Sequence, residues 1–255
     1  MVYTSSFALV PTICLSSSCL GRCLCKVSTA PSVSATFLRL LGLLEVGNAG
    51  PSLAAESVRL TERVLASRSM SSLGGTHTIF VAAGDPRIAA VVAQIPYAGL
   101  PKERVGRTYR QAGRIMWLAL KDRVRGWLGL SPLYVPAVGT VDEDAVLVDP
   151  HAREVTRFLS EDNSLWRNEV APRIIFDILR LKPLDVAARV QAPLLVSIAE
   201  RDAEAPPYLT RRLAELAPRG EVRSYPVTHY EMYRPDVREQ VLADQLVFLK
   251  KHLLP

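Results

Sequence analysis

Cysteine is almost absent from this chain of 255 residues. The four cysteines, Cys14, Cys19, Cys23 and Cys25, all lie near the N-terminus, and the rest of the chain has none. A core stabilised by disulfide bonds is therefore excluded. Cys23 and Cys25 are one residue apart and have no Cys or His pair downstream, which suits neither a zinc site nor a redox Cys-x-x-Cys motif. We expect exposed or disordered thiols.

Long hydrophobic runs are also missing. No stretch approaches the about 18 apolar residues that a membrane-spanning helix needs. Residues 7–15 (FALVPTICL) are apolar, but they contain Pro11 and no basic residue precedes them, so they make a poor signal peptide. We therefore expect a cytoplasmic protein with no membrane partner, and a secreted protein with a cysteine-rich N-terminus is the distant alternative.

Charge of one sign is not concentrated anywhere in the sequence. The formal net charge is +6, but Lys and Arg are scattered among Asp and Glu. No run combines basic residues with the interleaved aromatic residues of a nucleic-acid surface. We expect no nucleic-acid partner, and the composition leaves the oligomeric state open.

The texture of the sequence changes near residue 58. Residues 1–57 are rich in Ser, Thr and Cys and lack a rhythm of strands and helices, which predicts an irregular segment. In residues 58–255, short apolar runs alternate with helical patterns, which is typical of a mostly parallel sheet covered by helices. With 49% hydrophobic residues, the chain can bury a sizeable core in one α/β domain.

Several elements of that domain can be predicted from periodicity. Strands are expected at 88–95 and at 193–200, the second being a near-continuous apolar run that suits a strand buried on both faces. A helix is expected at 76–83 and another from Pro207 to Pro218, followed by a short strand at 221–225. Val237, Val241, Leu242, Leu246 and Leu249 share one face of a closing amphipathic helix. The section from about 98 to 190 has no strong strand and predicts a helical lid insertion.

Ser72 is the candidate nucleophile. It lies in Met-Ser-Ser-Leu-Gly-Gly (70–75), where a tight turn before a helix would expose the hydroxyl and Leu73 could offer its backbone N–H to an oxyanion. Met70 stands where the usual Gly-x-Ser-x-Gly pattern has its first glycine. A turn of this composition is more often a simple loop, so the motif alone is weak.

Asp202 and His229 complete the order Ser, acid, His that an α/β-hydrolase triad follows. Each comes directly after a predicted strand, and one helix and one strand fit between them. Separately, Asp202 could cap a helix and His229 could be a structural histidine. His77, one turn beyond Ser72, is the rival base, and its position favours packing under the turn or lining the pocket.

The motifs LGGTH (73–77), DPRIAAVVAQ (85–94), WRNE (166–169), AERD (199–202) and YPVTH (225–229) resemble the α/β-hydrolase superfamily over roughly residues 70–254. Within it, the chain is similar to a group of bacterial and fungal hydrolases that includes fungal polyketide transferases and thiohydrolases. This resemblance implies an acyl-enzyme on Ser72, formed from a small-molecule ester or thioester or from a carrier-bound acyl chain. It implies no metal or organic cofactor, and it suggests that Trp166 helps to shape the acyl pocket, although a Trp is more often plain packing.

The N-terminus departs from this resemblance. The superfamily places several strands before its nucleophile, and a loop after one of them supplies a second oxyanion donor, often beside a His-Gly pair. No His-Gly pair precedes Ser72. The first strands therefore look absent, either because residues 1–57 replace them through misprediction or aberrant splicing or because the chain is a shortened relative. A hydrolase-like binding or scaffold protein with impaired catalysis is the alternative function.

Overall fold

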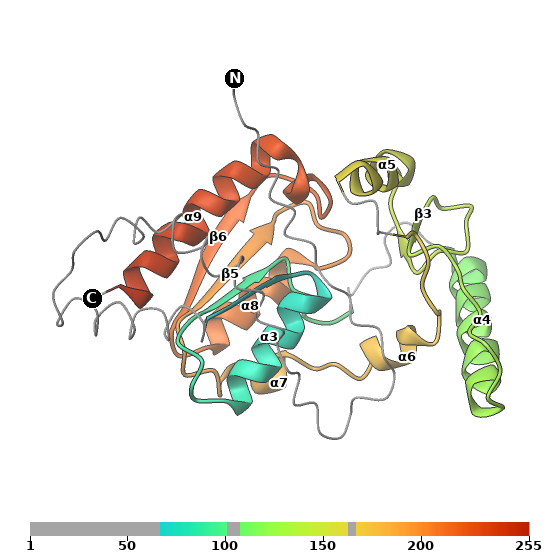
Figure 1. Ribbon diagram of the computed structural model, residues 1–255, viewed down its shortest axis with the longest axis horizontal. Coiled ribbons are helices and arrows are strands. Elements are labelled where there is room, and N and C mark those ends of the chain that lie inside the picture. The colour runs from blue at the N-terminus through green and yellow to red at the C-terminus, as the bar shows by residue number, and fades with distance from the viewer. Residues whose placement is uncertain (1–66, 101–107, 163–166, 255) are drawn as a thin grey trace, which may run out of the picture. The chain divides into compact units, whose positions relative to one another are not determined.

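A computed structural model describes residues 67–100, 108–162 and 167–254 (Figure 1). The predictions for residues 1–57, including the cysteines and the signal peptide, lie outside the described residues. The described chain belongs to two compact units, which are treated separately. One is Leu100–Leu181, and the other combines the residues up to Gly99 with those from Lys182 onward.

The second unit is an α/β core built on a parallel sheet. Its four strands lie in the order β1-β2-β5-β6, and every neighbouring pair is parallel. Helices and strands alternate along the chain, which is the connectivity that parallel strands require. The elements are β1 (Arg68–Ser71), α3 (Leu73–Gly84), β2 (Val91–Gln94), α7 (Leu184–Ala187), β5 (Leu194–Ala199), α8 (Pro207–Leu216), β6 (Gly220–Tyr225), the 3₁₀ helix η1 (Glu231–Tyr233) and α9 (Pro235–Leu253).

Helices cover both faces of this sheet. On one face, Ala93 and Val196 pack with residues of α3, α7 and α8. On the other, Val92 and Leu195 pack with Phe248 and other residues of α9, which lies across the sheet from α3 in Figure 1. Successive side chains of β2 and β5 therefore enter opposite layers, and this explains why both strands are apolar at all but one position each.

Most predicted elements of the core are present with small shifts. The strands expected at 193–200 and 221–225 are β5 and β6, and the closing helix is α9. The helix expected from Thr76 begins earlier, at Leu73. Strand β1 has the sequence RSMS and was not predicted as a strand from its pattern, because it has no apolar alternation. It forms through its ladder with β2, from Arg68 opposite Val91 to Ser71 opposite Gln94.

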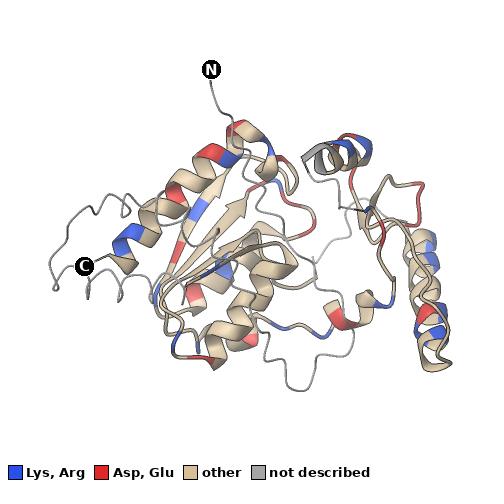
Figure 2. Ribbon diagram, viewed as in Figure 1, with Lys and Arg blue, Asp and Glu red and all other residues tan. Residues whose placement is uncertain are grey.

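The unit Leu100–Leu181 overlaps the predicted lid insertion, whose limits of about 98 and 190 stay a prediction. Its regular structure is mostly helical, as expected, since each of its described strands is only two residues long. Its elements are α4 (Tyr109–Trp127), β3 (Val138–Gly139), β4 (Leu147–Val148), α5 (Ala152–Asp162) and α6 (Ile174–Ile178). In Figure 2, the ribbon is blue at several Lys and Arg positions along α4 and red at acidic positions in the loop that follows β3. None of the helices that the structure describes has the length and apolarity of a membrane span.

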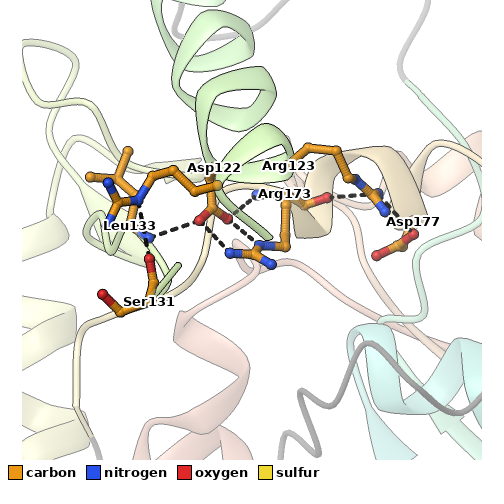
Figure 3. A network of polar contacts seen from close by, with 7 residues as sticks. Asp122, Arg123, Ser131, Leu133, Arg173 and Asp177 are labelled. Carbon is orange, nitrogen blue, oxygen red and sulfur yellow. Dashed lines mark hydrogen bonds and ion pairs between the residues drawn. The ribbon is translucent and has the colours of Figure 1, made fainter. Parts of the chain in front are cut away.

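A buried ion pair joins α4 to the segment that leads into α6. Asp122, whose side chain is fully buried, accepts from Arg173 Nε at 2.5 Å and Nη2 at 2.7 Å, and from the Leu133 backbone N–H at 2.8 Å (Figure 3). Burial alone would raise the pKa of Asp122, but the hydrogen bonds from Arg173 and Leu133 outweigh burial and hold this pKa below its ordinary value. Arg173 passes so close to α4 that a Cβ added at Gly126 would lie 2.2 Å from its Nη1.

Candidate active site

Ser72 lies on a sharp turn between β1 and α3. Its φ of 51° and ψ of −128° are a conformation that costs a non-glycine residue about 1–3 kcal/mol, so the surrounding structure must impose it. The backbone N–H of Ser72 donates to the Gln94 carbonyl at 2.9 Å, which ties the turn to the end of β2. A strained strand-to-helix turn is the geometry that presents a nucleophilic serine in α/β-hydrolases.

Met70 is accommodated beside this turn by a glycine farther along the chain. A Cβ added at Gly74 would lie 3.0 Å from Met70 Cε, so the Met70 side chain occupies space that the missing Gly74 side chain leaves open. At Gly75 the approach involves backbone, because an added Cβ would lie 3.1 Å from the Met70 carbonyl oxygen and 3.4 Å from that of Gln94. The two glycines let α3 begin directly against β1 and β2 even with a methionine at position 70.

Leu73 is the first residue of α3. The first N–H groups of a helix have no partner within the helix, and the helix dipole makes this end favourable for negative charge. The location is compatible with the predicted oxyanion role of Leu73, which stays a prediction.

Asp202 and His229 are brought together in the structure. Asp202 follows β5, and His229 follows β6, yet Asp202 Oδ2 and His229 Nδ1 are 2.7 Å apart, with side chains only 1% and 6% exposed. The other carboxylate oxygen, Oδ1, accepts the backbone N–H groups of Glu204 at 2.8 Å and Ala205 at 2.7 Å. These two donors fix the carboxylate. An ionised carboxylate can only accept, so this geometry places the His229 proton on Nδ1 and leaves Nε2 as an acceptor.

The three predicted triad residues belong to the same edge of the core. Ser72, Asp202 and His229 follow the C-terminal ends of β1, β5 and β6. Because these strands are parallel, their C-terminal ends lie along one edge of the sheet, which is where open α/β folds place their ligands. The structure thus supports a common location for the three residues.

The two other predicted site residues are less informative. His77 is on α3 and exposed, and its roles as a pocket residue or rival base stay predictions. Trp166 lies outside the described residues. Within the described part of the chain, no group of three or more His, Cys, Asp or Glu side chains could hold a metal ion.

Two residues near His229 were missed at the sequence level. Glu231 and Tyr233, both in η1, contact residues next to Asp202, His229 and Ser72. Thr228 lies only three residues from Glu231, but Arg201 and Ser71 lie 30 and 162 residues from their partners in η1, so the sequence pattern did not show these two contacts.

Comparison with solved structures decides the fold. The alpha/beta hydrolase GrgF from Penicillium superimposes with a TM-score of 0.56 at 23% identity, covering 73% of this chain and 63% of that chain. The chain has the α/β-hydrolase fold. DcsB in complex with its substrate analogue has the same fold, with a TM-score of 0.58 and 19% identity over 73% of this chain and 64% of that one. A monoacylglycerol lipase of Paleococcus ferrophilus also has this fold, with a TM-score of 0.52 and 20% identity over 82% of this chain and 78% of the lipase.

Curated sequences extend this likeness. The chain is 34% identical over 181 residues to the quorum-quenching protein AidA of Acinetobacter baumannii, covering 71% of this chain and 60% of that protein. It is 26% identical over 183 residues to a polyketide transferase of Aspergillus fumigatus, covering 69% and 60% of the two chains. No family model matches. The hydrolase-fold chain therefore spans about 60% of the length of these two relatives.

Proposed function

We propose that this protein is a serine-nucleophile hydrolase or acyltransferase that forms an acyl-enzyme on Ser72. The observation that carries the proposal is the buried Asp202–His229 pair at 2.7 Å, located at the same sheet edge as a serine held at φ 51° on a strand-to-helix turn. A structural histidine would not require a serine in a costly backbone conformation at that edge, whereas an α/β-hydrolase uses such a serine together with a histidine.

The proposed reaction has two halves. His229 Nε2 takes the Ser72 hydroxyl proton while Oγ attacks the acyl carbon, and Asp202 stabilises the imidazolium that forms. Backbone N–H groups at the start of α3, with Leu73 first among them, stabilise the oxyanion. The carbon–oxygen or carbon–sulfur bond then breaks, and the alcohol or thiol leaves with the proton from His229. Water or an alcohol, deprotonated by His229, attacks the acyl-enzyme and releases Ser72.

The substrate is proposed to be an ester or thioester of a small molecule, with a polyketide-type or carrier-bound acyl chain as the finer possibility. Similarity to a polyketide transferase supports that acyl class, and the fold shared with a monoacylglycerol lipase supports simpler esters. No part of the proposed chemistry calls for a metal or organic cofactor.

The test is active-site labelling with a fluorophosphonate probe. Wild-type protein should be labelled, Ser72→Ala should not, and Ser69→Ala should be labelled like wild type because Ser69 is an exposed serine on the same strand. A panel of p-nitrophenyl esters, lactones and acyl thioesters then defines the acyl group and leaving group. Equal labelling of wild type and Ser72→Ala would refute the assignment. Ligand binding without any labelling would favour the hydrolase-like binding protein.

A further inference from the structure

The one-turn helix η1 follows His229 almost directly and is anchored in the core. Its central residue, Met232, is fully buried and belongs to a cluster with Ile95, Ala199, Tyr225 and Val241. These partners come from β5, β6, α9 and the residue after β2. The flanking residues of η1, Glu231 and Tyr233, are therefore held at fixed positions relative to the C-terminal ends of the strands.

Glu231 bridges the loops that carry the acid and the base. Its Oε2 accepts the Thr228 backbone N–H at 2.8 Å and the Arg201 Nη2 at 3.2 Å. Thr228 directly precedes His229, and Arg201 directly precedes Asp202. The hydrogen bond from the Thr228 N–H, with smaller contributions from Arg201 and Arg234, holds the pKa of Glu231 below its ordinary value, so this carboxylate is ionised near neutral pH.

Tyr233 connects the same helix to the strand before the nucleophile. Its hydroxyl lies 2.6 Å from Ser71 Oγ, across 162 residues of sequence, and either group can donate. Ser71 directly precedes Ser72. Burial raises the pKa of Tyr233 to about 12, so the phenol keeps its proton throughout the useful assay range.

We propose that Glu231 and Tyr233 are positioning residues that hold Ser72, Asp202 and His229 in register. This inference rests on the proposed function. Each of the three contacts of η1 reaches the residue immediately before one triad member, so a single rigid turn fixes the three loops. Serine catalysis is sensitive to such placement, because a displacement of about 1 Å can lower the rate about 100-fold.

The positioning role differs from ordinary stabilisation in what it changes. A bond that only stabilises the fold affects the melting temperature and leaves the turnover of the folded protein intact. A bond that sets the register of the triad lowers kcat in fully folded protein and leaves KM almost unchanged, because the substrate-binding surface is untouched.

The experiment compares Glu231→Ala and Tyr233→Phe with matched controls. Alanine is used at position 231 because a glutamine oxygen would still accept the Thr228 N–H. Glu200→Ala removes an exposed carboxylate paired with Arg211 at 2.8 Å, and Tyr225→Phe removes a tyrosine hydroxyl that donates to Asp244 at 2.8 Å. With a p-nitrophenyl ester, we expect kcat to fall about 10-fold in each η1 variant with KM within about twofold, and to stay within about twofold of wild type in both controls. Melting temperatures and labelling stoichiometry with the fluorophosphonate probe show whether every variant is folded.

A double-mutant cycle tests the contact to the nucleophile strand directly. Ser71→Ala and Tyr233→Phe should each lower kcat, and the double variant should lose little more than either single one, because both remove the same hydrogen bond. Wild-type kcat in both η1 variants, or an equal loss in the controls, would overturn the inference while leaving Ser72 as the nucleophile. Absence of Ser72-dependent labelling in wild-type protein would refute the proposed function and this inference together.

Discussion

Replacing Asp202 by Asn tests the tautomer that the site depends on. Oδ1 of Asp202 accepts two backbone N–H groups, from Glu204 and Ala205, and Oδ2 faces His229 Nδ1. An asparagine has one carbonyl oxygen, and the two backbone donors require that oxygen on their side. Its NH₂ group then points at Nδ1, which must become an acceptor, and the ring proton moves to Nε2. His229 can no longer accept the serine proton there.

The expected loss of kcat in Asp202→Asn follows from removing the general base while the fold stays intact. A wrong histidine tautomer costs about 10³- to 10⁴-fold in kcat, or about 4–5.5 kcal/mol of transition-state stabilisation. The variant keeps both backbone hydrogen bonds to the side-chain oxygen, so the free energy of unfolding should change little. The assay is the rate of fluorophosphonate labelling together with kcat on a p-nitrophenyl ester, and circular dichroism monitors the thermal transition.

Asp244→Asn is the matched control for this substitution. Asp244 accepts the Tyr225 hydroxyl at 2.8 Å, and an asparagine oxygen can accept the same bond, so activity should stay within about twofold of wild type. If Asp202→Asn kept more than a tenth of wild-type kcat, the role of Asp202 in fixing the His229 tautomer would be refuted. The serine could still be a nucleophile, but it would need another base.

Further predictions concern stability. Gly75→Ala should lower the free energy of unfolding by about 1–2 kcal/mol, because its Cβ would meet backbone oxygens, whereas Gly74→Ala should be nearly neutral, because a flexible side chain can move. Gly220→Ala should cost about 3 kcal/mol, since its Cβ would lie 1.9 Å from a carbonyl oxygen of α8. Arg173→Ala should cost about 3 kcal/mol by leaving Asp122 buried without its partner. Urea titrations followed by circular dichroism measure all four variants.

The Asp122–Arg173 pair also predicts a pH dependence. The pKa of Asp122 is lower in the folded chain than in the unfolded chain. Its contribution to stability is therefore fully present above the ordinary aspartate pKa of about 3.9 and is lost as the pH falls through the folded-state value. Asp122 lies on α4, so far-UV circular dichroism at decreasing pH should report this acid-side loss. Equal acid sensitivity in wild type and Arg173→Ala would contradict the assignment.

Much of the core could be predicted because its strands are buried on both faces. A strand such as β5, with every residue buried, is apolar except at Ser197, and the apolar residues of α9 must recur with the helical period. Strand β1 could not be predicted in this way, since its polar residues pair through backbone groups that every sequence has. From the sequence alone, Met70 argued against a nucleophilic turn at Ser72. The space that Gly74 leaves for the Met70 side chain is visible only in three dimensions.

The sequence by itself determined the α/β fold class and the order Ser72, Asp202, His229, because burial periodicity and the placement of polar residues after strands are both written along the chain. Only the tertiary structure decided that Asp202 and His229 meet, that Ser72 has a positive φ and that η1 reaches all three loops. Those features depend on distances between segments far apart in sequence. Such distances are set by the packing of the whole sheet, and no local pattern encodes them.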